Sequence, residues 1–170
     1  MAKLTEYTVF QGRAGDHNDL AIPGARAIGE ELARRSGVSP TVIGTPEPAL
    51  NIGWREELDA ALPYLREMQL RLDEVFAGGG VSIAATSRCA VSLATLPAVA
   101  KHHPCACIVW FDSHGDLNPP DASISGYLGG LAFAGYPSEV GRGTWGLARG
   151  SIAEWRSTRT KSMTRSCVIR

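Results

Sequence analysis

Three side chains that bind metal ions well recur at every second position after an apolar run. Asp112, His114 and Asp116 follow Ile108–Phe111, whose β-branched and aromatic residues are typical of a strand buried on both faces. If the extended geometry continues, alternation places all three side chains on one side of the chain. Carboxylates suit hard ions such as Mn²⁺, and imidazole suits borderline ions. The pattern therefore predicts a divalent metal site, whereas a lone Asp or His would indicate a helix cap or an exposed loop residue.

Alternating strands and helices would position this motif at the end of a sheet. The predicted strands are Tyr7–Phe10, Thr41–Ile43, Val81–Ala85 and Ile108–Phe111, and the predicted helices are Gly24–Ser36, a longer one capped by Asn51 and reaching Phe76, and Val91–Ala100. We expect Pro63 to kink or split the long helix. This order implies a mostly parallel, doubly wound sheet with right-handed crossovers, and such sheets bind ligands at the carboxyl ends of their strands.

The motif and the loop after it resemble a known family. The stretch Trp110–Asp116, followed by Asn118, Pro120, Ser123, Ser125 and Gly126, resembles the second metal motif and substrate loop of the arginase (ureohydrolase) family. The similarity is strong from Val81 to Gly135. It implies a three-layer α/β/α fold, here incomplete at the carboxyl terminus, and a pair of Mn²⁺ ions that hydrolyse guanidino or formimino groups.

The resemblance also implies roles for single residues. Asp112 would bridge both ions, Asp116 would bind the first and His114 the second, and these three would be the catalytic groups. The polar side chains of Asn118, Ser123 and Ser125 would hydrogen-bond the amino and carboxylate end of an arginine-like substrate.

Two positions depart from the family pattern. At the junction after Val81–Ala85, the family has Gly-Gly-Asp followed by His or Cys, the last residue being a ligand of the first metal. Here Cys89 occupies the ligand position and Arg88 stands where an Asp is expected. A thiolate is a soft ligand for Mn²⁺, so Cys89 is either a ligand or a small buried hydrophobe. Gly129 stands where arginases carry a proton-shuttling His, which would weaken proton delivery to the leaving amine.

The end of the chain lacks the third metal motif of the family, Ser-Phe-Asp-x-Asp-x-x-Asp-Pro. We predict an arginase-like domain over 1–137 and a divergent basic tail over 138–170. From Glu139 onward, the tail contains seven Lys/Arg and two Glu. The tail fits three explanations: a basic arm for nucleic acid, the weakest of the three, an ordinary divergent helix, or a shifted reading frame. Coding nucleotides downstream of Tyr136 would distinguish a frame shift, because an S-F-D-x-D motif would appear in another frame.

Composition sets broad bounds on the class of protein. A chain of 170 residues predicts one domain, and its formal net charge of zero argues against a polyanion as partner of the whole protein. No run is long enough to cross a membrane, and the first residues lack the pattern of a signal peptide. Cys105 and Cys107 would share one strand face as buried, reduced thiols, which favours a cytoplasmic location.

These observations leave two hypotheses for function. The first is a manganese-dependent, arginase-type hydrolase that releases urea from a guanidino substrate, with two Mn²⁺ expected by resemblance and a homo-oligomer as in the family. The second is a truncated or degenerate member that binds one ion or none and does not turn over, because Arg88, Gly129 and the absent third motif all depart from the pattern.

Overall fold

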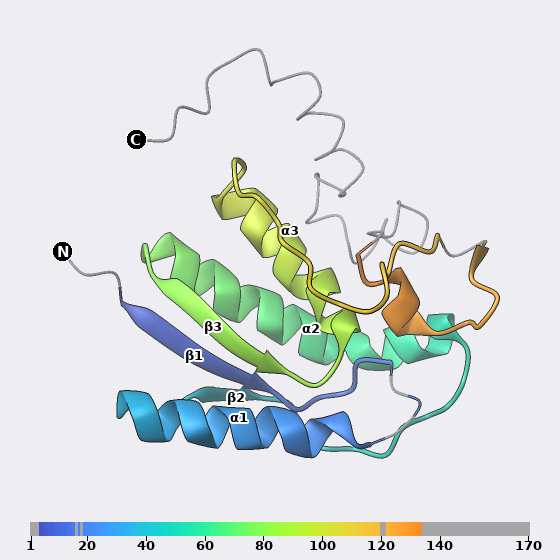
Figure 1. Ribbon diagram of the computed structural model, residues 1–170, viewed down its shortest axis with the longest axis horizontal. Helices are drawn as coiled ribbons and strands as arrows, with labels where there is room; N and C mark the ends of the chain where they lie inside the picture. The colour runs from blue at the N-terminus through green and yellow to red at the C-terminus, as the bar shows by residue number, and fades with distance from the viewer. Residues whose placement is uncertain (1–3, 16, 18, 120–121, 134–170) are drawn as a thin grey trace, which may run out of the picture.

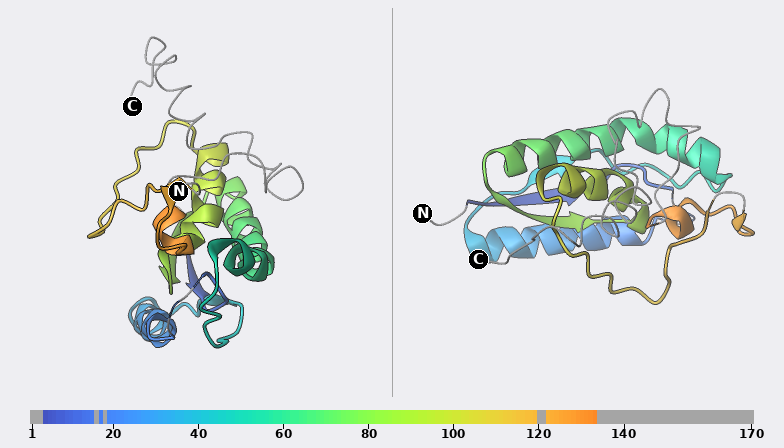
Figure 2. Two further views of the ribbon diagram at one scale, coloured as in Figure 1. Left: turned by 90° about the vertical axis from the view of Figure 1, so that its right-hand side faces the viewer. Right: turned by 90° about the horizontal axis from the view of Figure 1, so that it is seen from above.

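A small parallel sheet lies between helices on both of its faces. The computed structural model describes residues 4–15, 17, 19–119 and 122–133. Its three strands are β1 (Thr5–Phe10), β2 (Thr41–Ile43) and β3 (Val81–Thr86), in the order β2-β1-β3. Helix α1 (Ala21–Ser36) covers one face, and α2 (Trp54–Ala77) with α3 (Ser92–His102) lies on the other (Figures 1 and 2). The predicted three-layer α/β class is confirmed.

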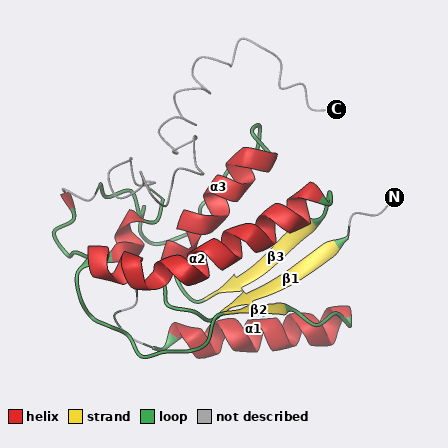
Figure 3. Cartoon of the chain, turned by 180° about the vertical axis from the view of Figure 1, so that it is seen from behind, coloured by secondary structure: helices red, strands yellow, loops and turns green. Residues whose placement is uncertain are grey.

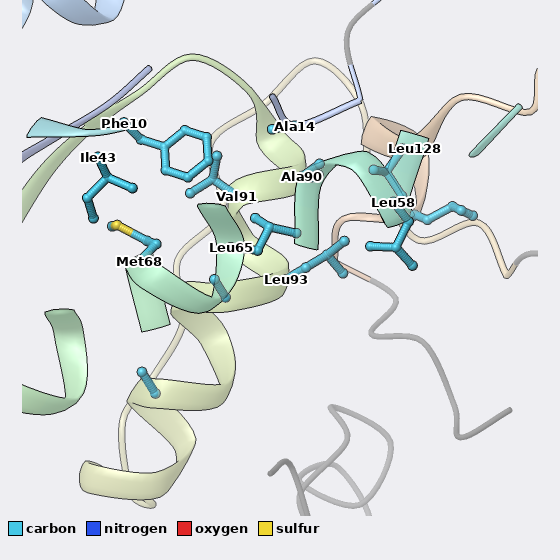
Figure 4. Packing of buried hydrophobic residues seen from close by; sticks show 14 of the residues in the cluster. Phe10, Ala14, Ile43, Leu58, Leu65, Met68, Ala90, Val91, Leu93 and Leu128 are labelled. Atoms are coloured by element: carbon cyan, nitrogen blue, oxygen red, sulfur yellow. The ribbon is translucent and has the colours of Figure 1, made fainter. Parts of the chain in front are cut away.

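The central strand β1 pairs in parallel with both neighbours. Thr8 is in register with Thr41 of β2 and with Ala84 of β3. Successive residues of β1 point to opposite faces: Val9 packs with Ala25 and Ala85 on the α1 side, whereas Phe10 joins the larger core under α2 and α3. In that core, Phe10, Ile43, Met68, Leu65 and Val91 converge (Figure 4). The larger core therefore fixes β1 and β2 to the helices that precede and follow β3.

The helices follow the predicted order but differ at their ends. Helix α1 starts at Ala21, three residues before the predicted Gly24, and ends at Ser36 as predicted, with Gly37 as its C-cap at a left-handed φ of 73°. Helix α2 runs unbroken through Pro63, so the expected split is wrong, and its N-cap is Gly53 and not Asn51 (Figure 3). None of the helices within the described ranges is long and apolar enough to cross a membrane.

The fourth predicted strand is wrong. Residues 106–112 have no strand pairing, and Val109 and Phe111 are exposed, the latter by 95%. Strand β3 is consequently an edge strand with Val81 and Ile83 exposed. An apolar run becomes a stable strand only when a neighbouring strand pairs with its backbone and other layers bury its side chains, and none of the described residues does both for this segment.

The cysteines also differ from the expectation of buried, reduced thiols. Cys105 is disulfide-bonded, and Cys107 is a free thiol that lies exposed. Because the segment that carries them is not a strand, the two side chains do not share a buried strand face. The predicted basic tail over 138–170, the domain boundary before it and the position of the third metal motif lie outside the described residues.

Candidate metal centre

Three potential ligands meet beyond the end of β3. Atoms of Cys89, Asp112 and Asp116 lie within 4.8 Å of one another. Cys89 opens the short 3₁₀ helix η1 (Cys89–Val91) three residues after β3, and the two aspartates belong to the loop that returns from α3. The carboxyl ends of parallel strands are where α/β proteins bind ligands, and Cys89 follows the carboxyl end of β3.

Asp112 is held by hydrogen bonds on both carboxylate oxygens. Its Oδ1 accepts a bond of 3.0 Å from the backbone N–H of His114, and its Oδ2 accepts a bond of 3.4 Å from the thiol of Cys89. The bond from the His114 backbone, followed by the one from Cys89, lowers the pKa of Asp112. Asp112 therefore stays ionised at neutral pH and presents a negative charge to the cluster.

Asp116 is the buried carboxylate of the cluster. The residue is only 9% exposed, and its Oδ2 has no hydrogen-bond partner among the described residues. Its backbone φ of 48° is left-handed, and its carbonyl oxygen accepts a bond of 2.8 Å from Phe133 N–H. Burial, opposed in part by a bond with Cys89, raises the pKa of Asp116. A buried carboxylate oxygen without a donor is an unfavourable group that a bound cation would stabilise.

Cys89 is a protonated thiol when no cation is present. Burial, a hydrogen bond to Asp112 and the charge of Asp116 raise the pKa of Cys89 to about 12. A coordinated cation inverts this balance, because metal binding deprotonates a ligating thiol. Two carboxylates and one thiol within 4.8 Å are thus a donor set that fits one divalent cation.

His114 does not belong to the close set. Its side chain is 81% exposed, and its Nδ1 lies 3.6 Å from Asp112 Oδ1 and 3.1 Å from Ser113 Oγ. The predicted convergence of all three side chains assumed an extended backbone from 112 to 116. The chain instead turns at Asp112, whose carboxylate bonds to the His114 N–H, so the alternation of faces does not hold.

Arg88, which stands where an Asp was expected, lies beside the cluster. Its Nη1 donates a bond of 2.9 Å to Ser87 O. Burial lowers the pKa of Arg88, while the nearby Tyr127 and Cys89 act in the opposite direction. The guanidinium therefore places a positive charge close to Cys89, which opposes a cation there.

Tyr127 is a site residue that the sequence alone did not single out. Burial raises its pKa, and the charges of Arg88, Cys89 and Asp116 act on its hydroxyl. A Cβ atom at Gly129 would overlap the Tyr127 ring, with 2.8 Å to its hydroxyl oxygen. The phenol thus fills the space that a side chain at position 129 would need. Its place between Ser125 and Gly129, two positions that the sequence pattern had singled out, was the available signal.

The three predicted substrate ligands lie in the loop that Tyr127 closes. Asn118 is exposed, and its backbone N–H donates to Gly130 O at 3.1 Å. Ser125 Oγ accepts a bond of 3.3 Å from Tyr127 N–H, so it stabilises its own turn. The hydroxyl of Ser123 is buried without a partner among the described residues. Their roles toward a substrate remain predictions.

Comparisons with known proteins find related sequences. The sequence profile described as "Arginase family" matches residues 15–160. The chain is 34% identical over 132 residues to the N(omega)-hydroxy-L-arginine amidinohydrolase of Streptomyces lavendulae, covering 78% of this chain and 48% of that protein. It is 32% identical over 77 residues to the arginase of Bacillus caldovelox, covering 45% of this chain and 26% of that protein.

Solved structures agree at the level of the fold. The arginase of Bacillus subtilis aligns with a TM-score of 0.60 and 23% identity, covering 78% of this chain and 46% of that one. The native arginase of Bacillus caldovelox aligns with a TM-score of 0.55 and 24% identity. The chain thus spans about half the length of the first curated relative and of the first structural neighbour.

Proposed function

Because the chain belongs to the arginase family, we propose that it acts as a manganese-dependent hydrolase of a guanidino, arginine-like substrate and releases urea. The observation that carries the proposal is the cluster of Cys89, Asp112 and Asp116, in which a buried carboxylate oxygen has no hydrogen-bond donor among the described residues. The fold and the sequence relatives support the same class of reaction, and the substrate follows from their names by analogy.

The described residues fit one cation better than two. Asp112, Asp116 and Cys89 would hold it, with the carboxylates suited to Mn²⁺ and the thiol suited to a softer ion. His114 would complete a second position only if its exposed ring turned toward the cluster. A bound divalent cation supplies Lewis-acid chemistry, polarising the substrate and lowering the pKa of water.

The chain's own groups would bind the substrate and supply protons. Ser123 and Asn118 would hydrogen-bond the amino-acid end of the substrate, since the Ser123 hydroxyl has no other described partner. Asp112 would stay ionised as a ligand of the cation, and the Tyr127 hydroxyl, whose raised pKa keeps it protonated, would donate a proton. The Tyr127 ring occupies the space that a side chain at position 129 would need, so its hydroxyl would take the proton-donating role of a residue there.

The test of the proposal is urea release from arginine with added Mn²⁺. Urea should form with the unchanged chain and disappear with Asp112→Ala, because that substitution removes a charged ligand. Asp59→Ala, which removes an exposed carboxylate on α2, is the matched control and should keep full activity. No urea above the blank at high protein concentration would contradict the proposal.

A second candidate is a truncated or degenerate family member that binds metal weakly and does not turn over. Arg88 beside the cluster and the exposed His114 favour it, because both reduce the affinity for a second cation. Metal analysis after dialysis against Mn²⁺ separates the two: two Mn per chain would contradict this candidate, and less than one without activity would support it. The coding nucleotides around Tyr136 would decide whether a shifted frame explains the absent third motif.

The remaining features of the proposal concern the assembly and its location. We propose a homo-oligomer by analogy with the family, which light scattering would test. A cytoplasmic location is part of the same proposal, and the disulfide at Cys105 is the observation that weighs against it.

A further inference from the structure

A second site opens at the same edge of the sheet, away from the metal cluster. A cavity of about 500 Å³ lies between the start of α1 and the loop that follows β2. None of its lining residues belongs to the set Cys89, Asp112 and Asp116. Its volume falls within the range of sites that hold small molecules, and its position at the carboxyl ends of β1 and β2 is typical of ligand sites in α/β proteins.

The deepest polar group of this cavity is Gln11, directly after β1. The residue is 8% exposed, and its backbone N–H donates to Ile43 O at 2.8 Å. Its side-chain amide lines the cavity and makes no hydrogen bond within the described part of the chain. The amide can therefore offer its two N–H donors and its carbonyl oxygen to a ligand in the cavity.

The charges around the cavity balance. Glu47 already accepts bonds from Arg13 and Tyr64, so its carboxylate is neutralised. Asp19 and Arg26 are the other two charged residues of the lining, one of each sign. Asp19 is held in place because its Oδ1 accepts a hydrogen bond of 2.7 Å from Ala49 N–H. Arg26 pairs with Glu30 at 3.2 Å at the exposed surface, where a ligand carboxylate would compete for the guanidinium.

The rest of the lining is apolar and rigid. Ile22, Pro23, Pro46 and Pro48 form these walls. Proline rings lose little conformational entropy on binding, so such walls are preorganised for an aliphatic group. One carboxylate, one guanidinium, one free amide and an apolar wall together suit a molecule that carries both charges and a short aliphatic chain.

We propose that this cavity binds a small zwitterion of the aliphatic amino-acid class. Its ammonium group would pair with Asp19, its carboxylate with Arg26, and its aliphatic chain would contact Ile22 and the prolines, with Gln11 hydrogen-bonding the polar end. The inference does not depend on the proposed hydrolase activity, since it involves no residue of the metal cluster.

Calorimetric titration of the full chain, treated with a chelator to remove metal ions, tests this site. The probes are leucine, isoamylamine, which lacks the carboxylate, and isocaproate, which lacks the ammonium group. Leucine should bind, and each analogue should bind at least about tenfold more weakly, because each loses one charge-assisted interaction. Equal binding of leucine and either analogue, or no binding of leucine, would overturn the proposal.

Variants assign the binding to these residues. Asp19→Asn, Arg26→Gln and Gln11→Leu should each weaken leucine binding about tenfold, whereas Arg66→Gln, on the exposed side of α2, should leave it unchanged. Asp19 and Arg26 lie at the surface, so those two variants keep the test valid if Gln11→Leu fails to fold. Binding that is unchanged in both surface variants, or weakened as much by Arg66→Gln, would refute the site.

Discussion

At the scale of single residues, the Asp116 carboxylate destabilises the metal-free fold but would favour binding of a cation. Asp116 is buried, adopts a left-handed φ of 48° and has a carboxylate oxygen without a donor among the described residues. Burial raises its pKa above the ordinary 3.8. Folding is therefore favoured by protonation, and this contribution to stability is lost as the pH rises through the raised pKa. A bound cation would offset the cost of burying the ionised carboxylate by pairing with it.

Asp116→Asn should stabilise the metal-free chain at neutral pH. Asparagine keeps the shape and tolerates a left-handed φ, but it carries no charge to bury. Urea unfolding should show a higher midpoint for the variant near neutral pH and no difference below the ordinary pKa of 3.8, where Asp116 is protonated in both states. The variant should also bind Mn²⁺ at least about tenfold more weakly. A lower midpoint at neutral pH would contradict this account.

The thiol of Cys89 should resist alkylation in the metal-free chain. Its pKa of about 12 leaves almost no thiolate near neutral pH, and the thiolate is the reactive form. Iodoacetamide followed by mass spectrometry should label the exposed Cys107 first and Cys89 only at strongly alkaline pH. Cys107→Ser serves as the control for assignment. Equal labelling of the two thiols would show that Cys89 is not buried among carboxylates.

At the scale of elements, local patterns predicted the βα order well and long-range pairing poorly. The strands ending at Phe10 and Ile43 and the long helix reaching Phe76 agree with the structure, apart from the helix cap and the split expected at Pro63. Their apolar spacing is a local property of the chain. The strand at Ile108–Phe111 is absent, because a strand also needs a partner that sequence periodicity does not specify. The same error affected the site: the predicted Asp112 and Asp116 do lie together in the candidate cluster, but the turn between them directs His114 outward, and their role as ligands stays a prediction.

Pro63 offers a test at this scale. It lies exposed inside α2, which runs unbroken although the residue has no N–H for the carbonyl of Asp59. Pro63→Ala should restore that hydrogen bond without loss of packing and raise the free energy of unfolding by about 2 kcal/mol. Urea denaturation with a two-state fit measures the change. A decrease would mean that the proline ring contributes packing that outweighs the missing bond.

At the scale of the whole molecule, some large apolar side chains are buried in the core and others are exposed. The larger core under α2 and α3 buries Phe10 fully, whereas Phe111 is 95% exposed and β3 presents Val81 and Ile83 to solvent. Exposed apolar side chains near an edge strand favour association between molecules.

Phe111→Ser should leave stability almost unchanged and improve solubility. Because the ring makes little contact, the free energy of unfolding should change by less than about 0.5 kcal/mol. The matched change Phe10→Ser should cost about 4 kcal/mol, since it opens a cavity and buries a hydroxyl. Urea unfolding and static light scattering measure both effects. A large loss for Phe111→Ser would indicate that this segment packs as a strand after all.

The order β2-β1-β3 also indicates at which edge of the sheet the next strand along the chain would pair. Both connections join parallel strands. The first runs from β1 through α1 to β2, and the second runs from β2 through α2 to β3, on the opposite side of β1. Helix α3 lies on the same face as α2 (Figure 2). A right-handed path after α3 leads only to the unpaired flank of β3. A further parallel strand joined through α3 would therefore add its backbone to β3 and leave β2 at the opposite edge of the sheet.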